Sequence, residues 1–328
     1  MSPPPSVSTA VDHPPLAESS LVIPATRGGV LAKDATLSAI GLAVLAAVFF
    51  SMGDVVAKVL TGTLPAIEVA WLRYIVFCLV VVPTAFVARG PQAMHTGVLR
   101  LQIIRALAGA GSTVLFFLGL RYLPVAEATA ILFISPIFIT ALSIPLLGEK
   151  VGIRRWAAAV VGFLGVMLVV QPGGSAFQLA ALLPICAAIG GAVTAITTRQ
   201  LCTERPETTL AWTSMIGLVA LTIFMPFNWQ APTIGEIGLA ILMGAFSLVG
   251  HWLTILAYRK AAASTVAPFT YVQLIFAGLL GFAVFGMIPG AMTLVGGLII
   301  AASGLYTAHR EHARAREARL AAAGIRQP

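Results

Sequence analysis

The stretch "VAEATAILFISPIFITALSIPLLGEKVG", residues 125–152, has a counterpart in "ASTVAPFTYVQLIFAGLLGFAVFGMIPG", residues 263–290. Each begins with small residues, continues through a proline and several aromatic residues, and ends in a tight turn that contains glycine. The segments that follow, "AAAVVGFLGVMLVV" and "TLVGGLIIAASGLYT", are also alike. Any two helices rich in Gly and Ala share some residues, but the matched order of these features favours an internal duplication.

The composition of the chain indicates that both copies lie in a membrane. Hydrophobic residues make up 59% of the 328 positions, charged residues only 10%, and the mean hydropathy is +0.96. Soluble domains are about half apolar and about a quarter charged. A helix that spans a bilayer needs about 20 predominantly apolar residues. That length predicts ten spans: 37–60, 66–88, 99–120, 125–146, 155–171, 177–198, 208–227, 236–257, 264–285 and 290–308.

The duplication divides these spans into two halves, residues 37–171 and 177–308. Because each half has an odd number of spans, the second half crosses the membrane in the opposite direction to the first. Inverted repeats are typical of secondary transporters, whose substrate site lies near the mid-plane where the halves meet. We therefore predict an all-α polytopic membrane protein with ten transmembrane helices in two inverted five-helix repeats.

The basic residues predict how the chain is oriented. With the N-terminal tail in the cytoplasm, most of the 20 Lys and Arg residues fall on the cytoplasmic side, and the outer loops hold only Arg121. The positive-inside rule then places both termini in the cytoplasm. Residues 1–36, rich in Pro and Ser, are expected to be a disordered tail, and residues 309–328 a basic tail. This topology in a cell inner membrane accounts for the net charge of +8 without a nucleic-acid partner.

Three segments of the first half resemble the ten-helix EamA-type branch of the drug/metabolite transporter superfamily. They are "GDVVAKVL…LPAIEVAWLRY" at 53–74, "RALAGAGSTVLFFLGLRYLPVAEATAILFISPIF" at 105–138 and "LLGEKVGIRRWAAAVVGFLGVMLVVQPG" at 146–173. The resemblance covers roughly residues 37–308, and it implies two EamA repeats, alternating access and transport of a small organic metabolite without ATP. One departure is Met287, which stands where the family usually has an acidic residue, whereas the first half keeps Glu149.

Charged residues within the spans predict where a substrate binds. A charge that faces lipid at mid-bilayer costs about 2.5–3.5 kcal/mol, so retained charges usually face a cavity or the bundle interior. Asp54 and Lys58 have the spacing of neighbours on one helix face, and we expect them to pair. Either this pair fixes the packing, or Lys58 leaves Asp54 to bind an anionic substrate group. For Arg73 the sequence leaves three roles open: substrate binding, pairing with Glu68, or snorkelling to the membrane surface. Arg105 is expected to snorkel.

Aromatic and polar residues in later spans complete the predicted site. Prolines near Phe133 and Tyr271 can expose backbone carbonyls to a cavity, and the rings can stack on a planar ligand or simply fill the core. His251 is a candidate pH-sensitive group because imidazole titrates near neutrality. The predicted substrate-binding residues are Lys58, Asp54, Arg73, Phe133, Tyr271, Gln273, His251 and Trp252.

The residue pattern favours a transporter over a membrane-embedded enzyme. A lipid-modifying transferase would need histidines and acidic residues clustered at one interface, or a nucleophile with its base, but the 5 histidines are scattered. The sequence also has no GxSxG, HExxH or phosphate-binding P-loop motif. We therefore expect no catalytic residue, no metal and no cofactor.

The expected function is secondary active transport of a small organic metabolite through the bilayer. The candidate substrates are a vitamin such as riboflavin and an amino-acid-like compound such as S-adenosylmethionine. Export of toxic amino acids or metabolites is the alternative direction. The sequence leaves open whether a proton is coupled and whether the protein is a monomer or a homodimer.

Overall fold

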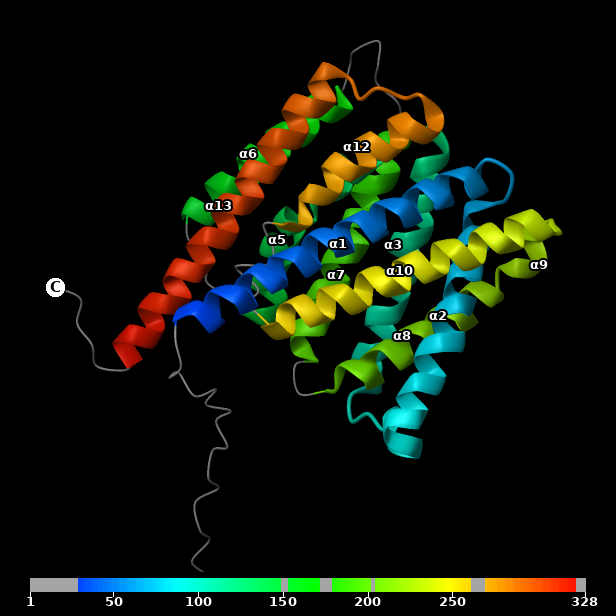
Figure 1. Cartoon of the computed structure of the whole chain (residues 1–328), viewed down its shortest axis with the longest axis horizontal. Coiled ribbons are helices and arrows are strands. Elements are labelled where there is room, and N and C mark those ends of the chain that lie inside the picture. Colours follow the sequence, from blue (N-terminus) through cyan, green and yellow to red (C-terminus); the bar gives the residue numbers. More distant parts are fainter. Residues whose placement is uncertain (1–28, 149–152, 172–178, 202–203, 261–268, 323–328) are drawn as a thin grey trace, which may run out of the picture.

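The computed structural model describes residues 29–148, 153–171, 179–201, 204–260 and 269–322. The described residues form helices and connecting turns, and no strand occurs among them (Figure 1). The helices are α1 (Gly29–Thr61), α2 (Ala66–Arg89), η1 (Gly90–Met94), α3 (Leu99–Tyr122), α4 (Val125–Leu132), α5 (Ser135–Leu147), α6 (Ile153–Val170), η2 (Leu179–Ala181), α7 (Leu182–Gln200), α8 (Pro206–Thr222), α9 (Met225–Asn228), α10 (Ile234–Lys260), α12 (Val272–Phe285) and α13 (Ala291–Ala322).

The predicted spans fall on these helices, and the all-α membrane fold is confirmed. In the described part of the chain, 6 segments are long and apolar enough to cross a membrane. The shorter apolar segments Trp156–Val170, Val272–Phe285 and Ala291–Tyr306 correspond to three further predicted spans. The remaining span, 208–227, corresponds to α8 and α9. The first helix begins at Gly29, inside the predicted N-terminal tail, and the last continues to Ala322, inside the predicted basic tail.

Two predicted spans are interrupted where a proline enters the helix. A proline lacks the backbone N–H, and its ring clashes with the carbonyl four residues earlier. The helix α4 ends at Leu132, four residues before Pro136, and α8 ends at Thr222, four residues before Pro226. The fourth predicted span is therefore two helices, α4 and α5, and the seventh is α8 and α9.

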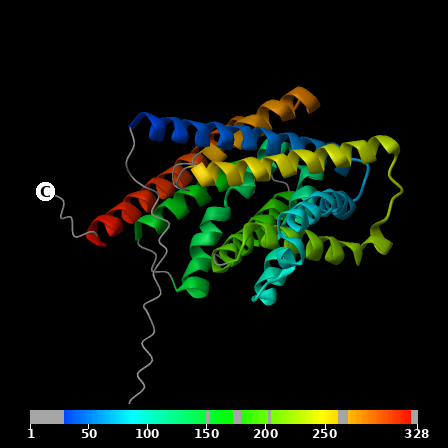
Figure 2. The same ribbon diagram turned by 60° about the horizontal axis from the view of Figure 1, so that its bottom comes forward.

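The helices of the two halves pack in pairs that repeat when the halves are exchanged. The first helix of one half packs on the third helix of the other, as α1 on α10 and α7 on α3. The corresponding second helices, α2 and α8, pack on each other, as do the last helices, α6 and α13. Figures 1 and 2 show α1 beside α10 and α6 beside α13 from two directions. This exchange is the pattern expected of two repeats related by a two-fold axis.

Glycines mark equivalent points of the two repeats. The helices α5 and α12 are followed directly by Gly148 and Gly286, and both glycines have φ +67°. Glycine adopts this left-handed conformation without the steric cost that a Cβ brings, and it is the usual helix C-cap. In both halves, the helix therefore stops at the glycine that the sequence pattern places there. Glu149, whose counterpart is Met287, lies outside the described residues.

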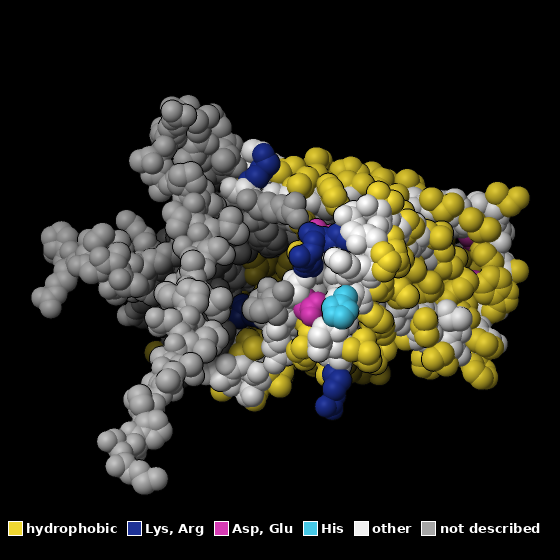
Figure 3. Space-filling model, turned by 90° about the horizontal axis from the view of Figure 1, so that it is seen from below, with side chains coloured by type: hydrophobic (Ala, Val, Ile, Leu, Met, Phe, Trp, Pro, Cys, Tyr) yellow, Lys and Arg dark blue, Asp and Glu magenta, His cyan; other side chains and the backbone are white. Residues whose placement is uncertain are grey.

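The surface of the described chain is largely apolar. Figure 3 shows hydrophobic side chains over most of the surface, while Lys, Arg and His side chains gather toward the part drawn in grey. Among the exposed side chains are Val87, Phe227 and Ile234, each more than four-fifths exposed at 89%, 86% and 91%. Such a surface is stable against lipid and not against water.

Candidate substrate site

Asp54 of α1 and Gln273 of α12 bind each other across the two repeats. The Gln273 Nε2 donates a hydrogen bond of 3.0 Å to Asp54 Oδ2. One turn earlier on α1, the Ser51 hydroxyl donates to the backbone carbonyl of Gln273, also over 3.0 Å. Both Asp54 and Gln273 are partly buried. The structure therefore joins two predicted site residues that the sequence places in different halves.

Lys58 does not pair with Asp54, so the predicted ion pair within α1 is wrong. The Lys58 Nζ donates two hydrogen bonds of 2.7 Å, to the backbone carbonyls of Leu120 and Leu123 at the end of α3. The last carbonyls of a helix have no partner in their own helix and carry partial negative charge. They therefore compete with the Asp54 carboxylate for the ammonium group. No ion pair joins Asp54 and Lys58, both of which are described residues.

Arg73 of α2 lies between aromatic rings and near Asp54. Its guanidinium carbon is 5.5 Å from the ring centre of Phe77 and 5.7 Å from that of Phe117. A cation over an aromatic face at this distance is attracted by the ring quadrupole. Asp54 and Arg73 also attract each other electrostatically. Glu68, the alternative partner, instead accepts a hydrogen bond of 3.0 Å from the backbone N–H of Gln230.

His251 of α10 is held between two phenylalanines. Its ring makes edge-to-face contacts with Phe50 at 4.9 Å and with Phe77 at 5.4 Å between ring centres. The Nδ1 atom lies 2.8 Å from the Ser247 carbonyl. Because a carbonyl only accepts, Nδ1 carries the proton, and Nε2 is the ring atom left to bind a ligand. Arg73 interacts electrostatically with His251, so the two share one region of the bundle.

Trp252 is far more exposed than these residues. Its side chain is 64% exposed and lines an apolar groove of about 480 Å³ between α2, α8 and α10. His251 lines the same groove from its neighbouring position. The exposed indole is placed like a lipid-facing side chain, which distinguishes it from the other predicted site residues.

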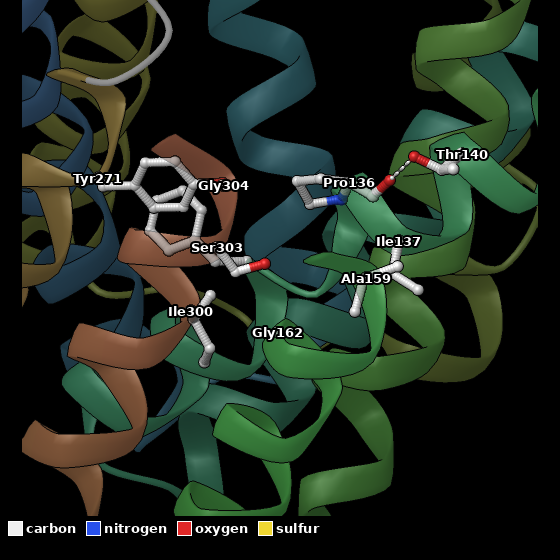
Figure 4. A pocket seen from close by; sticks show the side chains of 10 residues that line it. Pro136, Ile137, Thr140, Ala159, Gly162, Tyr271, Ile300, Ser303 and Gly304 are labelled. Carbon is white, nitrogen blue, oxygen red and sulfur yellow. Dashed lines mark hydrogen bonds between the residues drawn. The ribbon is translucent and has the colours of Figure 1, made fainter. Parts of the chain in front are cut away.

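Phe133 and Tyr271 meet where the two repeats cross. Their ring centres are 4.9 Å apart, with 42° between the planes. The two residues occupy equivalent positions, each the same distance before the glycine that ends its helix. Figure 4 shows Tyr271 above Gly304, facing the side of the pocket formed by Pro136 and Thr140. Only about 20 Å³ of this pocket is open to water, so the space beside the two tilted rings has no room for a metabolite.

Arg105 of α3 is the interior residue that the sequence interpretation missed. Its Nε donates a hydrogen bond of 2.8 Å to the Thr198 hydroxyl and its Nη1 bonds the Thr213 hydroxyl, two partners that the expectation of snorkelling did not include. Arg105 thus links the first repeat to α7 and α8 of the second. The signal in the sequence was the group of threonines at the ends of those spans, which can bind a buried guanidinium.

The candidate site therefore combines Asp54, Gln273, Arg73 and His251, which come from α1, α12, α2 and α10. Charged and hydrogen-bonding groups sit among phenylalanine rings in a two-repeat helical membrane bundle. This combination of fold and site is that of a membrane transporter.

Comparison with known proteins agrees with this class. Residues 37–171 and 178–307 each match the EamA-like transporter family. The chain is 32% identical over 283 residues to a riboflavin transporter of Rhizobium johnstonii, covering 84% of this chain and 92% of that protein. It is 28% identical to an S-adenosylmethionine uptake transporter of Rickettsia bellii, covering 83% and 94% of the two chains. It is 26% identical to a pseudopaline exporter of Pseudomonas aeruginosa, covering 81% and 94%.

The chain belongs to the EamA-like transporter family, within the drug/metabolite transporter superfamily, and its two matched segments are the predicted repeats. A solved crystal structure with 19% identity superposes at a TM-score of 0.60, covering 84% of this chain and 98% of that one, which supports the fold. The protein is accordingly a multi-pass membrane transporter for a small molecule.

Proposed function

We propose that the protein is a secondary active transporter that imports riboflavin, or a metabolite with a similar planar ring system, by alternating access. The observation that carries this proposal is the grouping of Arg73 and His251 among phenylalanine rings, beside the Asp54–Gln273 hydrogen bond. A planar heterocycle can stack on the rings while its edge meets donors and acceptors. Relatives at 32% and 30% identity are riboflavin transporters.

S-adenosylmethionine is the second candidate, and Asp54 is the observation that favours it. A carboxylate at membrane depth attracts the positive sulfonium and ammonium groups of that compound. Arg73 would meet its carboxylate, because guanidinium groups bind carboxylates with two parallel hydrogen bonds. The relative from Rickettsia bellii takes up S-adenosylmethionine.

The proposed orientation in the bacterial inner membrane has both termini in the cytoplasm. The end of the bundle opposite the termini, called the distal end below, then faces the outside. It contains the connections between α1 and α2, α3 and α4, and α12 and α13. The proposed direction is import, and the pseudopaline exporter among the relatives makes export the alternative.

Uptake by cells that can neither make nor import riboflavin tests this function. Cells that express the protein should take up labelled riboflavin with saturable kinetics, and unlabelled riboflavin should compete while S-adenosylmethionine should not. Saturable uptake of labelled S-adenosylmethionine without uptake of riboflavin would favour the second candidate. Release from preloaded cells without uptake would favour export. Movement of neither compound in either direction would contradict both substrates.

A further inference from the structure

At the distal end of the bundle, Lys58 contacts two other helix ends at once. Its ammonium donates to the carbonyls of Leu120 and Leu123 over 2.7 Å each, and it lies 5.6 Å from the ring centre of Phe285. Leu120 is in the last turn of α3, and Phe285 is the last residue of α12. Lys58 therefore joins α1 and α3 of the first repeat to α12 of the second.

Glu127 of α4 extends this contact to α13. It attracts Lys58 electrostatically, and its Oε1 is 3.5 Å from the hydroxyl of Thr293, the length of a weak hydrogen bond. Thr293 is only 4% exposed, so this contact lies inside the distal end.

We infer that Lys58 is a positioning residue that holds the distal gate closed, and that it does not bind the substrate. The inference rests on the proposed transport function, since alternating access requires the distal ends of the two repeats to separate. Two of the three ammonium protons are already used by backbone carbonyls. Because those carbonyls lie at the end of a helix, water can donate hydrogen bonds to them in place of Lys58 when the gate opens. Opening then exchanges hydrogen bonds and leaves no buried acceptor unpaired.

A matched position exists in the second repeat. Trp71 and Trp212 stand at the same place in α2 and α8, and Lys58 and Arg199 precede them by the same number of residues. Arg199 lies in the last turn of α7, at the end of the bundle nearer the termini. A substitution there changes a helix-end cation on the opposite side of the membrane, and it serves as a control for any general effect of lost charge.

The experiment measures access to the distal half without needing a substrate. The three cysteines, Cys78, Cys186 and Cys202, are replaced by alanine, and Ala57 is replaced by cysteine as a reporter. Ala57 is 0% exposed and three residues beyond Asp54, on the same face of α1. Intact cells are treated with a membrane-impermeant maleimide, and the labelling rate is compared for parent, K58Q, K58R, E127Q and R199Q.

A separate cysteine at Ile288, 77% exposed in the turn after α12, reports that the distal end faces outside.

K58Q should label at least about tenfold faster than the parent, the factor expected from one lost charge-assisted hydrogen bond. E127Q should also label faster, while K58R and R199Q should stay close to the parent rate. The inference is overturned if K58Q and E127Q, eluting as folded protein in size-exclusion chromatography, label as slowly as the parent. Equal labelling together with loss of substrate binding in K58Q would assign Lys58 to the substrate.

Failure of the proposed function gives a different result. If riboflavin and S-adenosylmethionine are both wrong, uptake is absent while the labelling rates still change with Lys58. If the orientation is wrong, the cysteine at Ile288 does not label from outside. The three outcomes are therefore separable within one set of variants.

Discussion

Replacement of Gln273 by leucine tests the contact with Asp54 that joins the two repeats within the candidate site. Leucine has nearly the size of glutamine but no donor, so the 3.0 Å hydrogen bond to Asp54 is lost. The bond from Ser51 is accepted by the backbone carbonyl of Gln273 and is kept in the variant. The substitution thus leaves a carboxylate that has lost its side-chain donor within the membrane.

The expected loss follows from the charge of the acceptor. Side-chain hydrogen bonds between membrane helices average about 0.6 kcal/mol and reach about 1.7 kcal/mol, while those to charged groups contribute about 1.5–3 kcal/mol. We expect Q273L to lower the free energy of unfolding by about 1.5–2 kcal/mol. In D54N/Q273L no buried charge is left without a donor. The double substitution should therefore lower the free energy of unfolding by about 1 kcal/mol less than the sum of the two single effects.

The assay is unfolding in mixed lipid and detergent micelles by titration with sodium dodecyl sulfate, followed by helical circular dichroism. The matched control is S135A, because Ser135 occupies the position of Gln273 in the first repeat and donates only a neutral bond of 3.2 Å to the Ala188 carbonyl. S135A should lower the free energy of unfolding by about 0.6 kcal/mol. Additivity of D54N and Q273L within about 0.5 kcal/mol would show that the Asp54–Gln273 bond contributes no coupling energy, and would refute the reasoning.

Two further predictions concern the aromatic contacts. R73K should reduce the initial uptake rate about tenfold at equal surface expression, because lysine cannot place a planar cation on the rings of Phe77 and Phe117. Uptake at the parent rate would show that transport does not need the guanidinium. G304A should lower the free energy of unfolding by about 1–3 kcal/mol, because a Cβ there overlaps the Tyr271 ring. G278A, whose Cβ would meet only Pro289 at 3.4 Å, should be close to neutral in the same titration.

The fold was predictable because its determinants are local. The length of each apolar segment and the order of Pro and Gly along it are properties of the linear sequence, and both repeats follow from them. The break before Pro136 obeys a steric rule, yet Pro145 lies inside the continuous helix α5. Which proline ends a helix therefore depends on the neighbours of that helix, and the sequence pattern does not contain them.

The sequence predicted which residues are candidates for the site, but it did not predict the contacts that those residues make. Asp54 and Gln273 were both candidates, but their bond depends on how α1 and α12 are placed in space. The spacing of Asp54 and Lys58 identifies only acceptors within the same helix. One of the two carbonyls that accept a hydrogen bond from Lys58 belongs to Leu120, 62 residues further along the chain. The same limit applies to Arg105, whose threonine partners belong to the other repeat.

The match between the repeats shows that the central charges come from one of them. The register that aligns Trp71 with Trp212 pairs Asp54 with Ala195 and Arg73 with Ser214. The helix arrangement is thus close to two-fold symmetric, while the charged residues at its centre are not. A fully symmetric site would bind a ligand equally well in two orientations. With Asp54 and Arg73 on α1 and α2 only, we expect the charged group of a substrate to bind nearer the first repeat than the second.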